Sequence, residues 1–296
     1  MNGHFVLYLL ISLMTLLWSA NFIIGKVALR EFPPLLLGAL RIGLAGIFLA
    51  PAYWQATRAA RNRWWPGGDM SMLVFLAVCN VGNQLLFIYG LNRTSSAHSA
   101  WILGACPIFV LLIAARIGLE RITARKVLGM ALAISGVAYL AGHASPAPGA
   151  PLAQATLAGD AITLLAGILF SFFAVYAKTA TKTYGTVVVN GFAYIGGAVL
   201  LSPILLWKAP AFPFAHVTLA GWSSLLYMAA FPSVVCYLIY YHALTRVSAS
   251  RLAAFVYLEP VIATLLAVAF LGERITPPLV ASGTVIFGGV YLTERG

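Results

Sequence analysis

One carboxylic acid lies within an apolar segment of this sequence. Glu259 precedes Pro260 in the run AFVYLEPVIATLLAVAFL, residues 254–271. An ionisable group in such a setting is costly, and it commonly carries a proton or faces a charged ligand. The proline after it removes a backbone N–H and frees a carbonyl one turn earlier. The pair predicts a broken helix with a functional acid at the break. A structural acid that is neutral, hydrogen-bonded or paired with Arg41 is the competing interpretation.

A second group of polar residues has the spacing of one helix face. Asn80, Asn83, Gln84 and Phe87 stand at positions i, i+3, i+4 and i+7. Amides at such positions can hydrogen-bond a zwitterion or a sugar, while rings supply apolar walls. Hydrogen bonding between helices is the alternative explanation of this polar pattern. Trp18 and Trp101 are further candidates for the cavity, and anchoring at the membrane interface is their alternative role. The expected cavity residues are Trp18, Asn80, Asn83, Gln84, Trp101, Phe170, Tyr237, Tyr240 and Glu259.

Motifs for other chemistries are missing from the sequence. No phosphate-binding loop of the form G-x-x-x-x-G-K-[ST] occurs, so ATP is not expected to drive this protein directly. The three cysteines, Cys79, Cys106 and Cys236, all lie in apolar runs, and the five histidines are scattered singly. These spacings suit neither a metal site nor a nucleophile with a base. We therefore expect no cofactor and no metal, and an intramembrane enzyme is disfavoured.

The composition identifies the solvent in which these residues must work. Of the 296 residues, 61% are hydrophobic and only 8% are charged, whereas about a quarter of a soluble domain is charged. The net charge of +11 would suggest nucleic acid as a partner of a soluble protein. Here the basic residues lie in short segments between apolar runs, which is a membrane topology signal. We expect an all-α integral membrane protein with lipid as its solvent and no nucleic acid as partner.

Ten apolar runs are long enough to cross a bilayer as helices. With the N-terminus in the cytoplasm, the inner segments hold 12 Lys and Arg residues and the outer segments hold 5. This bias predicts that both termini are cytoplasmic, and that residues 54–69, with two tryptophans among arginines, lie at the inner interface. The expected spans are 5–26, 34–54, 70–91, 95–116, 125–142, 157–178, 186–207, 217–243, 249–271 and 276–292.

The two halves of the chain repeat each other. The segment CPIFVLLIAARIGLERIT, residues 106–123, matches EPVIATLLAVAFLGERIT, residues 259–276, at a shift of 153. Cys106 stands where the second copy has Glu259, so the repeat differs at the one intramembrane acid. Thr123 and Thr276 are expected N-caps of the helices that follow. Further matches join LNRTSSA (91–97) to LTRVSAS (244–250), and Trp18-Ser19 to Phe170-Ser171.

An odd number of spans in each repeat inverts the second copy in the membrane. Five spans per repeat predict an inverted-topology repeat, an arrangement in which transporters place the substrate near the midplane. The predicted parts are a first repeat at residues 1–142, an extracytoplasmic linker at 143–156 and a second repeat at 157–296. The fold class expected is therefore ten transmembrane helices, as two five-helix inverted repeats around a central cavity.

The sequence resembles the drug/metabolite transporter superfamily, in its ten-helix EamA branch. The resemblance is carried by LLWSANFIIGKVAL (16–29), PPLLLGALRIGLAG (33–46), the two repeat segments above, and the glycine-containing ends SGVAYL (135–140) and FGGVYL (287–292). It implies a cavity lined mainly by the first, third, fourth, sixth, eighth and ninth helices. It also implies outward transport of an amino acid, another metabolite, a nucleotide-linked sugar or a toxic cation.

The function expected from these observations is secondary transport of a small molecule. Amino-acid export across the cytoplasmic (inner) membrane by alternating access is the leading prediction. Export of toxic cations, drugs or another metabolite is the alternative, and a channel-like facilitator is a further one. Nucleotide-sugar transport is disfavoured because Arg41 is the one basic residue clearly within a span. The sequence leaves open whether protons are coupled to transport, and whether the protein is a monomer or a homodimer.

Overall fold

The computed structural model describes residues 3–59, 70–120, 122–143, 155–244, 246 and 255–295, and every element within these ranges is helical. The α-helices are α1 (Gly3–Ala28), α2 (Pro34–Ala59), α3 (Met70–Arg93), α4 (Ser96–Gly104), α5 (Cys106–Arg116), α6 (Ala124–Gly142), α7 (Leu157–Tyr184), α8 (Thr186–Lys208), α9 (Leu219–Ala230), α10 (Cys236–Leu244), α12 (Glu259–Leu271) and α13 (Pro277–Glu294). A 3-10 turn, η1 (Phe214–His216), precedes α9, and a π-helical turn, η2 (Phe231–Val235), joins α9 to α10.

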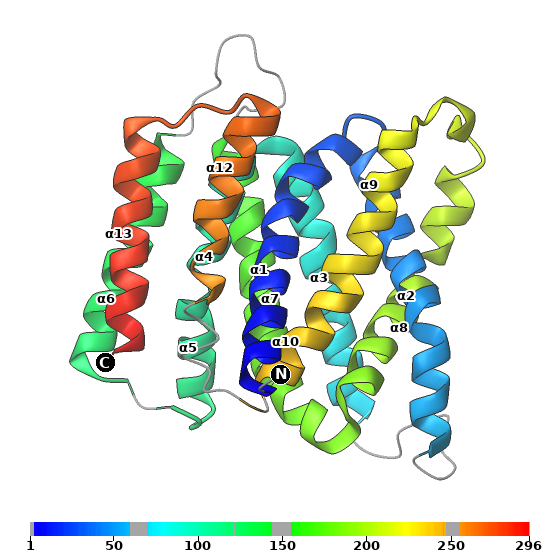
Figure 1. The fold of residues 1–296 in the computed structure, drawn as a ribbon, viewed down its shortest axis with the longest axis horizontal. Helices are drawn as coiled ribbons and strands as arrows, with labels where there is room; N and C mark the ends of the chain where they lie inside the picture. The colour runs from blue at the N-terminus through cyan, green and yellow to red at the C-terminus, as the bar shows by residue number, and fades with distance from the viewer. Residues whose placement is uncertain are drawn as a thin grey trace.

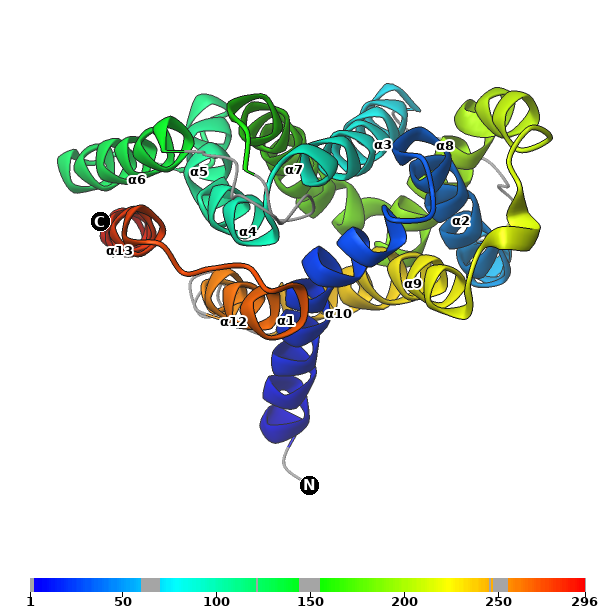
Figure 2. The ribbon, with the colours of Figure 1, turned by 90° about the horizontal axis from the view of Figure 1, so that it is seen from above.

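The helices run side by side, and both chain termini lie at the same end of the bundle (Figure 1). Seen from above, α6, α5, α4, α7 and α3 line one side, while α13, α12, α1, α10 and α9 line the other (Figure 2). The most extensive helix pairs are α3 with α7, α2 with α8, and α6 with α13. Each pair joins a helix from before residue 143 to one from after residue 156, so the two halves of the chain are packed into one body.

The outer surface of the bundle is apolar. Large side chains such as Leu206, Trp207 and Phe270 are mostly exposed, which water would disfavour and lipid allows. Eight helical stretches of the described chain are long and apolar enough to cross a membrane, and α12 and α13 are shorter apolar helices. An all-helical bundle satisfies its backbone hydrogen bonds internally, as hydrocarbon requires. The protein is a multi-pass membrane protein.

Helix interruptions occur at the prolines that the sequence pointed to. The predicted single span 95–116 is two helices, because Ala105 separates α4 from α5 and Pro107 lies in the first turn of α5. Pro260 lies likewise in the first turn of α12. A break at Glu259-Pro260 was predicted and is confirmed. The predicted span 217–243 contains a π-helical turn at Pro232, which its apolar pattern does not indicate.

The threonine caps are also confirmed. The hydroxyl of Thr123 accepts a hydrogen bond from Lys126 N at 3.2 Å, and that of Thr276 accepts one from Leu279 N at 3.4 Å. These contacts satisfy amides that the first turn of a helix leaves without partners. Pro277 takes the first position of α13, where its missing N–H costs nothing.

Several predicted segments lie partly outside the described residues. Residues 144–154 of the predicted linker, residues 60–69 of the predicted interface segment and residues 247–250 of the LTRVSAS match are among them. The described part of the interface segment ends α2, where the Arg58 guanidinium lies 3.7 Å from the centroid of the Trp54 ring.

Candidate functional site

A cavity of about 500 Å³ lies within the bundle and reaches one of its ends. Its walls come from both halves of the chain, with residues of α1, α2, α3, α4, α5, α6, α7, η2, α10, α12 and α13. A volume of this size is typical of a site for a small molecule. The central lining residues are Trp18, Asn21, Phe22, Arg41, Asn83, Gln84, Phe87, Leu103, Cys106, Pro107, Phe170, Pro232, Tyr237, Tyr240 and Glu259.

Most of the residues predicted from the sequence meet in this cavity, and two do not. Asn80 is buried on α3 away from the lining, one turn before Asn83. Trp101 lies on α4, where its indole N–H donates to Thr264 Oγ1 at 3.2 Å and so ties α4 to α12. The predicted residues that line the cavity are Trp18, Asn83, Gln84, Phe170, Tyr237, Tyr240 and Glu259.

Aromatic rings form one wall around Tyr237. Its ring centroid lies 5.8 Å from that of Trp18, with the planes nearly perpendicular, and 6.4 Å from that of Phe170. Trp18 also contacts Tyr240 at 5.7 Å and donates its indole N–H to Pro232 O at 3.3 Å. That carbonyl belongs to the π-helical turn, so the irregular backbone fixes the orientation of the Trp18 ring. The wall offers apolar faces together with phenol groups.

Glu259 lines the cavity at the start of α12. No cation among the described residues forms an ion pair with its carboxylate. The predicted alternative, in which Arg41 pairs with Glu259, is wrong for this structure because Arg41 Nε donates to Ser233 Oγ at 3.0 Å instead. The backbone carbonyl of Glu259 accepts a hydrogen bond from Ser19 Oγ at 3.3 Å. The helix break is thus stabilised by α1, while the acidic side chain borders the cavity.

Two further polar residues line the cavity that the sequence analysis did not include in the site. Asn21 is on α1, three residues after Trp18 and hence on the same face. Its side-chain oxygen is buried and has no hydrogen-bond partner among the described residues. Arg41, on α2, is only 2% exposed. The i, i+3 spacing from Trp18 could have revealed that Asn21 faces the cavity. The residues around Arg41 in the sequence give no sign that its side chain lines the cavity.

The two ends of the bundle differ, because buried hydrogen bonds join helices at one end and the cavity reaches the other. At the upper end in Figure 1, between α12 and α13, the carboxylate of Glu273 accepts hydrogen bonds from Ser96 N at 2.7 Å and Ala97 N at 3.1 Å. Glu273 is buried there, and it interacts electrostatically with the buried Lys26. At the lower end Glu120 is exposed, pairs with Lys126 at 2.9 Å and lines the cavity. The cavity therefore reaches the end that carries the chain termini.

A second carboxylate ties helices together at the closed end. Glu31, just after α1, accepts hydrogen bonds from Thr218 Oγ1 at 2.6 Å and Thr218 N at 2.7 Å, at the start of α9. These hydrogen bonds from the Thr218 hydroxyl and amide lower the pKa of the Glu31 carboxyl, because they favour its charged form. The contact is therefore present at neutral pH and is lost as the pH falls through the folded-state value.

Comparison with known proteins accounts for this architecture. The model of the EamA-like transporter family matches residues 6–142 and 157–295. The chain belongs to this family. This EamA-like transporter is 27% identical, over 97% of its length and 96% of the other chain, to an uncharacterized transporter of Archaeoglobus fulgidus. It is 24% identical to the uncharacterized inner membrane transporter YedA of Escherichia coli, over 94% and 87% of the two chains.

Two other similarities concern a named activity and the fold. The transporter is 27% identical to a probable terminal-alkyne amino-acid exporter of Streptantibioticus cattleyicolor, over 94% of its own length and 90% of that chain. A solved crystal structure with 20% identity superposes with a TM-score of 0.65 and covers 96% of this chain and 94% of the other. That likeness supports the fold. The family and the names of the relatives indicate a membrane transporter rather than an enzyme.

Proposed function

We propose that this EamA-like transporter exports an amino acid across the cytoplasmic membrane by alternating access. The observation that carries the proposal is Glu259, an acid without an ion-pair partner among the described residues, on the wall of a cavity of about 500 Å³. A carboxylate in this position suits the ammonium group of a substrate, and the aromatic wall suits its side chain. Similarity to a protein named as an amino-acid exporter supports the same substrate class.

Paired hydrogen bonds support an arrangement of ten spans in two inverted repeats. Ser171 Oγ donates to Cys106 O at 3.3 Å, just as Ser19 Oγ donates to Glu259 O at 3.3 Å. Each serine comes from the first helix of one repeat and reaches the broken helix of the other. The pairs α2 with α8 and α6 with α13 likewise join equivalent helices. The repeats would then correspond to residues 1–142 and 157–296, separated by a linker at 143–156.

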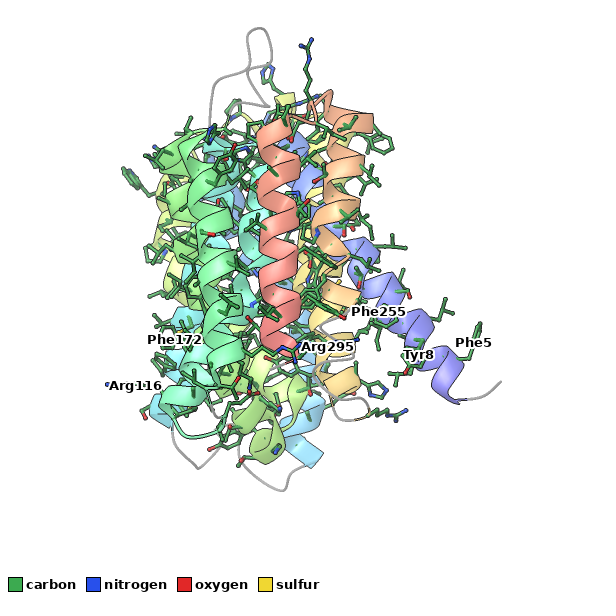
Figure 3. All side chains as sticks on the ribbon, turned by 90° about the vertical axis from the view of Figure 1, so that its left-hand side faces the viewer. Phe5, Tyr8, Arg116, Phe172, Phe255 and Arg295 are labelled. Atoms are coloured by element: carbon green, nitrogen blue, oxygen red, sulfur yellow. The ribbon has the colours of Figure 1, made fainter. Side chains whose placement is uncertain are left out.

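Basic residues support a cytoplasmic location for both termini. Arg116, Lys126 and Arg295 belong to the end of the bundle where the chain terminates, and Figure 3 shows Arg116 and Arg295 in its lower half. Positive residues favour the cytoplasmic side of a membrane. With this orientation the cavity opens to the cytoplasm, and the Glu273 contacts close the outer side. The conformation is then one that loads an internal substrate.

Glu259 would bind either the substrate ammonium or a coupling proton in this cycle. A single acid at the break of α12, with Cys106 at the equivalent break of α5, gives the two repeats different chemistry around a common framework. Tyr237 and Tyr240 supply hydroxyls near the aromatic wall, while Asn83 and Gln84 supply amides. These groups can hydrogen-bond the polar atoms of an amino acid.

Counterflow in proteoliposomes tests the proposal. Purified protein is reconstituted with one unlabelled amino acid inside, and uptake of the same labelled amino acid is followed, with L-phenylalanine, L-leucine and L-threonine tested in turn. We expect a saturable, transient accumulation for at least one of them, which a channel does not produce. Absence of counterflow for a full panel of amino acids, with a nonspecific leak ruled out by empty liposomes, would contradict amino-acid export.

A further inference from the structure

Arg41 is a buried cation on the cavity wall that lacks a matching anion. Its Nε donates to Ser233 Oγ at 3.0 Å, and Nη1 is buried without a hydrogen-bond partner among the described residues. No described acid forms an ion pair with it. Resting on the function proposed above, we propose that Arg41 binds the carboxylate of the transported amino acid, with Nη1 as a donor.

The π-helical turn holds the guanidinium in place. Ser233 lies within η2, and its hydroxyl donates to Met228 O at 2.8 Å, so its oxygen is oriented to accept from Arg41. A π-helical turn often marks a functional position in a longer helix. Because Nε is used in this contact, the guanidinium cannot rotate freely, and its remaining N–H groups keep a fixed direction. A fixed planar fork is the geometry that suits a carboxylate.

The energetic cost of this arrangement points to a ligand. A guanidinium stays protonated in proteins, and a charge within a membrane span is expensive unless it has a partner. Arg41 is 2% exposed, so bulk water does not solvate it fully. A structural role would be served by the single contact to Ser233, but that leaves Nη1 unsatisfied. A ligand carboxylate supplies both the missing charge and the missing acceptor.

Opposite charges in the cavity favour a zwitterion over a simple ion. Glu259 is on α12 and Arg41 is on α2, and both line the cavity without pairing with each other. Asn21 adds a buried, unpartnered oxygen on α1 that can accept from an ammonium. A toxic cation would be repelled by Arg41, and a dianion would be repelled by Glu259. At the mouth, Glu120 and Lys126 neutralise each other as an ion pair.

The first measurement asks whether carboxylates bind through Arg41. Thermal unfolding in detergent is followed with L-phenylalanine, phenylacetate, L-phenylalaninamide and 2-phenylethylamine, and with the leucine and threonine equivalents. We expect the amino acid to raise the unfolding temperature of the parent protein. The amide and the amine should need at least about tenfold higher concentrations for the same shift, because a charge-assisted hydrogen bond is lost. Arg41→Gln should abolish the preference for the carboxylate, and Arg41→Lys should retain part of it.

A matched control separates this effect from a general loss of charge. Arg116→Gln removes an exposed arginine at the end of α5 and should leave the carboxylate preference unchanged. Arg41→Gln must first give the same elution volume as the parent protein. Ser233→Ala provides a second variant, which keeps the charge but releases Nε. It should weaken the carboxylate preference less than Arg41→Gln does.

Counterflow with the same probes distinguishes this inference from the proposed function. If an amino acid gives counterflow but its amide binds and moves equally well, the carboxylate site is wrong and amino-acid transport stands. If carboxylates stabilise the parent protein in an Arg41-dependent way without any amino-acid counterflow, the site stands and the proposed function is wrong. If no carboxylate in the panel stabilises the parent protein, or Arg41→Gln keeps the full preference, the inference is overturned.

Discussion

The sequence Glu-Arg-Ile-Thr occurs twice, after α5 and after α12, and its glutamate is buried in one copy and exposed in the other. Glu273 is buried and accepts hydrogen bonds from the first amides of α4. Glu120 is exposed and pairs with Lys126 at the mouth of the cavity. Both copies end in a threonine that caps the following helix. The two copies therefore share the capping threonine and differ in the surroundings of their glutamates.

Lys26 and Lys178, which match each other at the 152-residue shift of Trp18-Ser19 and Phe170-Ser171, differ in the same way. Lys26 is buried near Glu273, whereas Lys178, at the equivalent position of the other repeat, is exposed. A closed end thus coexists with an open end, although the local sequences are alike. Under the proposed alternating-access cycle, this is the difference expected of one conformation, closed at one end and open at the other. In that cycle, the hydrogen bonds of Glu273 would form when this end of the bundle is closed and break when it opens.

Glu273→Ala should produce the largest change. It leaves the buried amides of Ser96 and Ala97 without an acceptor, which costs about 1–3 kcal/mol for each. Glu120→Ala removes only an exposed ion pair, which contributes less than about 1 kcal/mol. Thermal unfolding of both variants in detergent tests the contrast, with Glu273→Gln as a control that keeps one acceptor. Equal destabilisation by the two alanine variants would mean that the two ends are not in different states.

Glu259→Gln should have the next largest effect, now on transport. The change keeps the shape and removes the charge that faces a substrate ammonium or a proton, so we expect transport to fall roughly ten- to a hundredfold, or to lose its dependence on pH. Cys106→Ala alters the equivalent break in the other repeat and should transport nearly like the parent protein. Counterflow at several external pH values compares the two. Parental rates for Glu259→Gln at every pH would show that the acid is structural.

A small effect, and an equal one in both repeats, is expected at the paired serines. Each hydroxyl has one proton, which is shared between a carbonyl of its own helix at 2.8 Å and the interhelical carbonyl at 3.3 Å. Ser19→Ala and Ser171→Ala should therefore each cost at most about 1 kcal/mol. The two changes lie in separate contacts, so their effects should add in the double variant. Thermal unfolding of both single variants and the double variant measures this. A much larger loss for one serine would indicate that the pseudo-symmetry does not extend to the helix breaks.

Local features of this protein were predictable from its sequence. The break at Pro260 and the caps at Thr123 and Thr276 depend on a few adjacent residues, so their types alone specify them. Asn83 and Gln84, which the helical spacing put on one face, both line the cavity. The same spacing also suggested Asn80, which lies away from the lining because a periodic pattern gives a face only to within about a turn.

Contacts between distant residues were not predictable in the same way. Glu273 meets Ser96 across 177 positions, and Arg41 meets Ser233 across 192. The two Glu-Arg-Ile-Thr turns look alike in sequence, so nothing local indicates which one is buried. The pairing of Arg41 with Ser233 depends on the π-helical turn, which a hydropathy pattern does not reveal. Tertiary arrangement, rather than propensity, decides these positions.

Thiol labelling at two equivalent positions tests the difference between the two ends most directly. Val110 lines the cavity, and its counterpart Ala263 is fully buried. Each is changed to cysteine in a protein whose Cys79, Cys106 and Cys236 are replaced, and a membrane-impermeant thiol reagent is added to one side of the membrane at a time. We expect labelling of Val110→Cys from the cytoplasmic side only, and protection of Ala263→Cys from both sides until Glu273→Ala is added. Labelling of Ala263→Cys from outside in the presence of Glu273, or of Val110→Cys from outside alone, would contradict the account.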